Sequence, residues 1–111
     1  MTGIVAIWTT AADRDAAARI ARTLVEERLA ACVQIDRVES CYRWDGAVRI
    51  EPEARLTIKT VSALATQVTA RIVALHDYAL PEVLVVPITG GAPDYLAWVA
   101  AACGADAPAD G

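Results

Sequence analysis

The 111-residue sequence has only one histidine, His76, and three cysteines, Cys32, Cys41 and Cys103. The cysteines form no C-x-x-C pair, and their odd number argues against a disulfide framework and a structural zinc site. The sequence also lacks a G-x-S-x-G motif, a phosphate-binding glycine loop and a metal-spaced cluster of His, Cys and Glu. We therefore interpret the cysteines as small buried hydrophobic residues and expect no enzymatic activity.

Positive charge is scarce as well. Ten Lys and Arg residues against fourteen Asp and Glu residues give a net charge of −4 and a pI near 4.8, which is the wrong sign for binding nucleic acid. The first ten residues contain no basic segment, and their apolar run is far too short for a signal-peptide core or a membrane span. The sequence predicts a cytoplasmic protein that binds neither nucleic acid nor a membrane.

Apolar residues are abundant. The hydrophobic share is 56% and the mean hydropathy is +0.37, and both values are high for a small domain with a large surface-to-volume ratio. A chain of this length has room for one core. We expect a single domain with some apolar surface against another subunit.

The first half of the chain predicts two strands and a helix. The apolar run Ile4–Trp8 predicts a buried strand, and Asp13 is expected to cap a helix that runs to about Leu29. Residues 31–44 alternate as a strand does, but their apolar phase changes near Asp36. The change predicts a bulge or a bend there.

The second half predicts a hairpin, a helix, a strand and a short helix. Asp45-Gly46 is a strong turn signal because glycine accepts positive φ, and Pro52 predicts an edge or a bulge in the return arm. Ser62 is expected to cap the next helix. Residues 82–88 read as a central strand, and Pro93 as the first residue of the last helix.

This order, β-α-β-β-α-β plus a C-terminal helix, predicts an α+β, ferredoxin-like fold in which two helices cover one face of an antiparallel sheet. We expect one domain over residues 1–103 and a flexible tail over 104–111. The long hairpin exceeds what the helices can cover. Its far end must project, and a projecting ribbon needs a partner, so we expect a homo-oligomer.

His76 and Glu82 are the first candidate site residues. His76 falls at a predicted helix end, where an imidazole can bond the last carbonyls, ligate a metal or small anion, or act as a general base. Glu82, just before a strand, is a candidate oxygen ligand, a partner for Lys59, or a surface carboxylate.

Aromatic residues supply further candidates. Lys59 beside Tyr42 and Trp44 would form an amphipathic patch or a stacked interface. Tyr95 and Trp98 are three apart on the last helix and share one face. We expect that face to pack on the sheet edge or on the next subunit.

Five segments resemble the CutA family of divalent-cation tolerance proteins: "LVEERLAACVQI", "CYRWDGAV", "LTIKT", "LHDYALPEVLVVPI" and "YLAWV". The resemblance spans Ile4 to about Val99. It implies a tight homotrimer similar in shape to the PII-like signalling proteins and a link to tolerance of copper and other divalent cations. It implies no established reaction.

The resemblance also implies where a copper site would lie. In copper-binding members, a cysteine stands at the position of Thr9 and a histidine pair at Leu75 and His76. Only His76 is retained here, and Asp77 replaces the proline that relatives carry. The candidate ligands for Cu(II) or another divalent cation are therefore His76, Asp77 and Glu82.

Three hypotheses for function follow. The first is a metal-ion response. The second is a PII-like sensor that binds a small anion in clefts between subunits, and the third is a trimeric interaction scaffold. The candidate cleft residues are Cys32, Tyr42, Trp44, Lys59, His76, Tyr78, Glu82, Tyr95 and Trp98.

Overall fold

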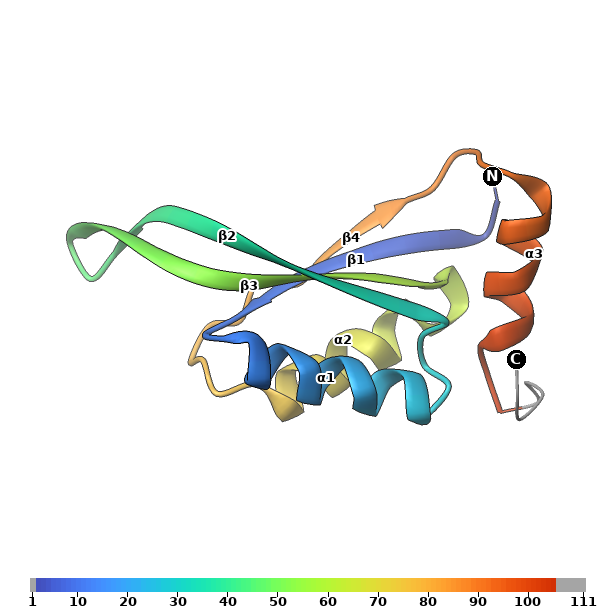
Figure 1. The fold of residues 1–111 in the computed structure, drawn as a ribbon, viewed down its shortest axis with the longest axis horizontal. Coiled ribbons are helices and arrows are strands. Elements are labelled where there is room, and N and C mark those ends of the chain that lie inside the picture. The colour runs from blue at the N-terminus through green and yellow to red at the C-terminus, as the bar shows by residue number, and fades with distance from the viewer. Residues whose placement is uncertain (1, 106–111) are drawn as a thin grey trace.

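The structure, a computed structural model, describes residues 2–105 and contains a four-stranded sheet with three α-helices (Figure 1). The elements in chain order are β1 Ile4–Ala11, α1 Arg14–Glu26, β2 Cys32–Trp44, β3 Ala47–Val61, a 3-10 turn Ser62–Leu64, α2 Ala65–Leu75, β4 Leu84–Pro87 and α3 Pro93–Ala102. The sheet order is β2-β3-β1-β4 and every pairing is antiparallel. The predicted α+β, ferredoxin-like fold is confirmed.

The core lies between the sheet and the pair α1 and α2, which cover one face of it (Figure 1). Alternate residues of a strand point to opposite faces, so each strand gives one set of side chains to this core. Ile7, Leu24, Leu56, Ile58 and Ile72 have no exposed surface. Burial of these apolar side chains is the main force that holds the helices on the sheet.

Helix α1 begins as predicted and ends earlier. The Asp13 side chain accepts a hydrogen bond from the Ala16 N–H at 2.8 Å, which confirms the cap. The helix stops at Glu26 and not near Leu29, because Arg28 has a φ of 60°. The N–H groups of Leu29 and Ala30 then both donate to the Leu24 carbonyl, which closes the helix end.

Two other predicted boundaries are wrong. Strand β1 continues past Trp8 to Ala11 because its ladder with β3 runs on to Ala11 opposite Ala54. Ser62 is not a side-chain cap, since it opens the 3-10 turn and its N–H donates to the Gly3 carbonyl at 2.8 Å.

The predicted bulge near Asp36 is also wrong. The ladder between β2 and β3 is unbroken from Cys32 opposite Lys59 to Trp44 opposite Ala47. Asp45 and Gly46, both with positive φ, form the two-residue turn that the sequence predicted. The apolar phase changes because the inner residue Val33 packs on the core, whereas Trp44 lies beyond it on the opposite face of the hairpin.

We call residues 38–53 the ribbon, because these parts of β2 and β3 extend beyond Ala54, where the pairing of β3 with β1 ends. The ribbon forms the long projection in Figure 1, and the described chain measures 45 × 26 × 22 Å. Neither helix covers it.

Pro52 lies at an edge, which confirms one of its two predicted settings. The Ser62 N–H bonds Gly3 before β1, and the Lys59 carbonyl accepts from Ala31 on the β2 side. Hydrogen-bonding groups alternate in direction along a strand, so even-numbered residues of β3 point away from β2. At Pro52 that side has no strand within residues 2–105, and the missing N–H therefore costs no ladder bond.

Strand β4 is an edge strand and not the central strand that its apolar sequence suggested, because within the described residues it pairs only with β1. Leu84 and Val85 remain about half exposed. An apolar edge of this kind is a common place for another chain to join.

The end of the described chain is tied down at Gly104, whose N–H donates to the Arg28 carbonyl at 2.8 Å. The predicted tail over 104–111 falls for the most part outside the described residues. Within residues 2–105, no helix is long and apolar enough to cross a membrane.

Candidate functional site

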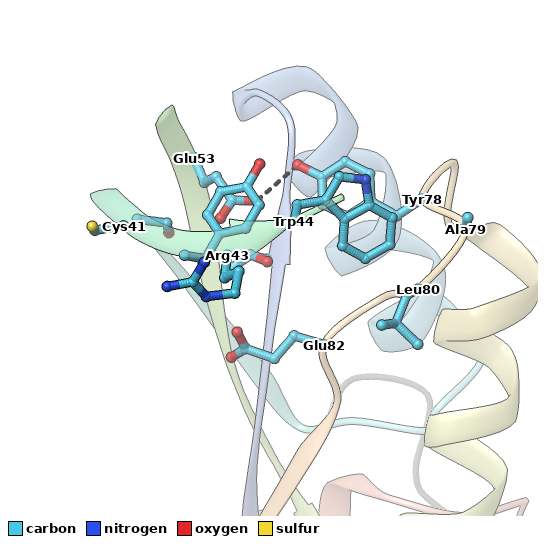
Figure 2. A pocket seen from close by; sticks show the side chains of 11 residues that line it. Cys41, Arg43, Trp44, Glu53, Tyr78, Ala79, Leu80 and Glu82 are labelled. Atoms are coloured by element: carbon cyan, nitrogen blue, oxygen red, sulfur yellow. Dashed lines mark hydrogen bonds between the residues drawn. The ribbon is translucent and has the colours of Figure 1, made fainter. Parts of the chain in front are cut away.

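A hollow of about 650 Å³ lies between the ribbon and the loop that connects α2 to β4 (Figure 2). We call it the ribbon hollow. The residues that line it are Thr10 of β1; Ser40, Cys41, Tyr42, Arg43, Trp44 and Glu53 of the ribbon; and Tyr78, Ala79, Leu80 and Glu82 of the loop. Four predicted site residues, Tyr42, Trp44, Tyr78 and Glu82, therefore come together here.

Two tyrosine hydroxyls bind carboxylates of the ribbon. Tyr78 donates to Glu53 Oε2 at 2.8 Å (dashed in Figure 2), and Tyr42 donates to Glu51 Oε1 at 2.7 Å. Burial, followed by the bond to Glu53, raises the pKa of Tyr78 well above its ordinary value. The bond to Glu51 is the main cause of the raised pKa of Tyr42. Both phenols are therefore neutral donors at neutral pH.

His76 stands at the C-terminal end of α2, as predicted, but it bonds two other elements and not the last carbonyls of the helix. Its Nδ1 accepts from the Tyr78 backbone N–H at 3.1 Å, and its Nε2 bonds the Thr10 carbonyl of β1. A carbonyl oxygen can only accept, so Nε2 is the donor in its bond to Thr10, and both ring nitrogens face backbone groups. The His76 ring also contacts Tyr78, at 4.5 Å between centroids, and so fixes the start of the loop.

The three predicted metal ligands do not meet at one point. His76 and Asp77 line a small recess beside α1, whereas Glu82 lines the ribbon hollow. The Asp77 side chain is largely exposed and lies 3.7 Å from Arg19. Among residues 2–105, no group of three or more His, Cys, Asp or Glu side chains has the arrangement to hold a metal ion.

Other candidate cleft residues gather at the opposite end of β2. Cys32 pairs with Lys59 across the strands, and Lys59 Nζ donates to the Gln34 side chain. Burial, with the Cys32 thiol as a second cause, raises the pKa of Tyr95. The ring of Trp98 lies 5.6 Å from that of Tyr95, so the predicted shared face of α3 is confirmed.

The predicted neighbourhood of Lys59 with Tyr42 and Trp44 is wrong within one chain. Tyr42 pairs with Arg49 and lies ten residues along β2 from Cys32, or roughly 33 Å at 3.3 Å per residue. Glu82 is not an ion-pair partner of Lys59 among the described residues.

The interpretation of the cysteines as buried is wrong for Cys41, which is exposed on the ribbon, where no helix covers the sheet. Cys32 and Cys103 are half-buried. The Cys103 sulfur lies 3.6 Å from the Thr60 hydroxyl.

Sequence reasoning missed Glu51 and Glu53, the two carboxylates that bind tyrosines. The signal was present. A two-residue turn at Asp45-Gly46 sets Tyr42 opposite Arg49 and hence places Glu51 diagonally across from Tyr42 on the same face.

Comparisons with known proteins agree with one another. The family described as CutA1 divalent ion tolerance protein matches residues 5–102. The chain is 41% identical to protein CutA, chloroplastic, of Arabidopsis thaliana over 86% of its own length and 53% of the relative. It is also 41% identical to the divalent-cation tolerance protein CutA of Thermus thermophilus, over 84% of this chain and 91% of that one.

Solved structures give the same result. The divalent cation tolerance protein of Thermus thermophilus superimposes with a TM-score of 0.87 at 38% identity, covering 91% of this chain and 99% of that one. CutA1 from Oryza sativa gives a TM-score of 0.89 at 35% identity over 96% and 100% of the two chains. The chain spans about half the length of the two plant CutA sequences it matches.

His76→Ala removes both ring bonds and leaves the buried Thr10 carbonyl without its partner. We expect a loss of about 1–3 kcal/mol in unfolding free energy, measured by urea unfolding at fixed protein concentration. Asp77→Ala is the matched control, and it should cost under about 1 kcal/mol because its ion pair is exposed. Equal losses for the two variants would contradict the assigned role of His76.

Tyr78→Phe tests the raised pKa of Tyr78. The folded protein holds the phenol proton more tightly than the unfolded chain, so this stabilisation is complete below pH about 10 and declines as the pH rises further. The stability advantage of the wild type over Tyr78→Phe should therefore shrink above pH about 10. Absorbance titration at alkaline pH should show that the variant has lost the most alkaline tyrosine step. An unchanged last step would refute the assignment.

Proposed function

The chain belongs to the family of CutA1 divalent ion tolerance proteins, and from that premise we propose that it works as a non-enzymatic homotrimer in the divalent-cation response of the cytoplasm. The homotrimer is the stoichiometry that the resemblance implies. The observation that carries the proposal is the ribbon, whose outer backbone groups and apolar side chains have no partners within residues 2–105.

The open edge of β3 is the first part of this observation. Because even-numbered residues of β3 direct their backbone groups away from β2, Val48 and Ile50 present unpaired N–H and C=O groups within residues 2–105. Both side chains are 63% exposed. A two-stranded ribbon of this kind is marginal alone in water, and strand addition from another copy would satisfy it.

The apolar edge strand β4 is the second part. Leu84 is 52% exposed and Val85 46%, and in the described part of the chain the strand has only β1 beside it. Each chain thus offers two incomplete surfaces at different places on the sheet. Surfaces that differ can join head to tail, which closes into a ring when the rotation between copies permits it.

A copper site does not fit the residues of one chain. Both nitrogens of His76 are bonded to the backbone. Thr9, which stands where the resemblance places a cysteine ligand, is fully buried, and its Oγ1 has no hydrogen-bond partner among residues 2–105. A buried neutral hydroxyl and an engaged imidazole are a poor donor set for Cu(II), which prefers several N or S ligands. We therefore assign no step of the response to copper held by His76.

Nothing in the described residues favours the small-anion sensor. Its three proposed contacts are already engaged within the chain: Lys59 bonds Gln34, Tyr42 bonds Glu51, and His76 bonds Thr10 and Tyr78. The interaction scaffold requires only the trimer and stands as the second hypothesis.

Ile50→Lys tests the assembly. The side chain is 63% exposed in a single chain, so a monomer should tolerate the charge, whereas a paired ribbon should not. We expect the wild type to sediment at about three times the 11.7 kDa of one chain and Ile50→Lys to sediment near the single-chain mass. Val73→Lys, at a 52% exposed position of α2, is the control and should leave the wild-type mass unchanged. A folded wild type at the single-chain mass would refute the proposal.

Calorimetric titration of Cu(II) into the untagged protein tests the role of His76 in metal binding. We expect the wild type and His76→Ala to give the same heat at a temperature where both are folded, since the imidazole nitrogens are already engaged. Binding heat that disappears only in His76→Ala would show that the ring leaves Thr10 to ligate the metal.

A further inference from the structure

The ribbon has little within its own chain to hold it in place. Of residues 38–53, all but Val38, Ser40 and Glu53 are exposed, and neither α1 nor α2 covers this part of the sheet (Figure 1). The ribbon hollow, with a volume of about 650 Å³, lies between the ribbon and the loop that connects α2 to β4. A two-stranded segment with so few buried contacts bends easily. Its angle to the sheet therefore depends on the contacts at its base.

One hydrogen bond at the base joins the ribbon to another segment. The Tyr78 hydroxyl donates to Glu53 Oε2 at 2.8 Å (Figure 2). Within residues 2–105, and apart from the strand ladder, no other hydrogen bond and no ion pair connects residues 38–53 to the rest of the chain. Burial is the main cause of the raised pKa of Tyr78, so this hydroxyl is partly removed from water. A bond to a carboxylate is stronger there than in open solvent.

The segment that carries Tyr78 is itself anchored to the sheet. Two residues earlier, His76 bonds the Thr10 carbonyl of β1 and the Tyr78 backbone N–H, and the two rings lie 4.5 Å apart. The two anchors stand on either side of the point where β1 ends. Thr10 is the second-last residue of β1, whereas Glu53 is the first residue beyond Ala54, the last partner of β1 on β3. Residues 76–78 therefore span the base about which the ribbon would bend.

We propose that residues 76–78 are a strap that holds the ribbon at a fixed angle to the sheet and so prepares it to join neighbouring copies. A ribbon already held in the joining orientation loses less freedom on association. A fixed angle also lets copies that join head to tail close into a ring. The effect on assembly rests on the homotrimer proposed above, whereas the hold on the ribbon can be measured in a single chain.

The first test measures the order of the ribbon in the Ile50→Lys background, where assembly is blocked. NMR order parameters of the ribbon amides should lie near about 0.85, the value of a rigid backbone, and fall toward about 0.6 in Tyr78→Phe. Amides of β1 and of the helices should keep their values. A bond that only stabilised the fold would leave the order parameters of the folded chain unchanged. Residual dipolar couplings, which also report slower reorientation, should shrink for the ribbon as a group.

Tyr42→Phe is the matched control. The Tyr42 hydroxyl also donates to a carboxylate, Glu51, but that bond lies wholly within the ribbon, so its loss should leave the ribbon as ordered as before. Glu53→Ala removes the other half of the strap's bond and should loosen the ribbon as Tyr78→Phe does. The double variant should be no looser than either single one. Glu53→Gln keeps an oxygen that accepts from the phenol and should retain most of the order.

The second test is sedimentation over a dilution series, with Ile50 restored. We expect Tyr78→Phe to dissociate at a protein concentration about tenfold or more above that of the wild type. Tyr42→Phe should dissociate where the wild type does.

Four results would contradict part or all of this inference. Unchanged ribbon order in Tyr78→Phe would overturn the strap, since the strand ladder alone would then hold the ribbon. Equal loosening in Tyr42→Phe would overturn it as well, because the effect would not depend on the bond that crosses the base. Lower order with wild-type dissociation would overturn the role in assembly. A wild type that sediments as a single chain would refute the homotrimer, and the order parameters of that chain would still decide the strap.

Discussion

The two-residue turn at Asp45-Gly46 is the constraint on which the rest of the structure depends. Positive φ at both residues allows β2 and β3 to reverse direction without a longer loop, so every pair down to Cys32 opposite Lys59 follows in fixed order. The pairing of β3 with β1 ends at Ala54, so the part of the hairpin beyond it projects from the sheet. The same register also brings the carboxylates of β3 within reach of Tyr42 and Tyr78, so the fold and the hollow share one cause.

Much of the fold was predictable because it depends on short stretches of neighbouring residues. The helix cap at Asp13, the hairpin turn and the proline start of α3 each depend on a few neighbouring residues. The errors came from the assumption that one face of a strand is buried along the whole length of the strand. Strand β2 packs on the core at Val33 and leaves it before Trp44, which imitates a bulge in the sequence. Strand β4 is apolar although it lies at an edge of the sheet, and no contact within the described residues explains its apolar composition.

The site was less predictable because it depends on contacts between distant segments. His76 was recognisable as a helix end, but its bonding partner is the Thr10 carbonyl, 66 residues away, and no pattern near His76 indicates that carbonyl. Lys59 was misplaced because the pairing of the hairpin arms was not counted from the turn, although the turn determines it. Only the folded chain brings the loop from Tyr78 to Glu82 against the ribbon.

Pro52 also limits how copies of the chain can aggregate. Its ring nitrogen faces the open side of β3, where Val48 and Ile50 offer N–H donors but Pro52 offers only a carbonyl. An incoming strand therefore finds a gap in the row of donors, which restricts both the length and the alignment of the segment that can add there. Endless stacking of ribbons into a fibre requires an uninterrupted row. Pro52 therefore favours an assembly of limited size over a fibre that grows by repeated strand addition.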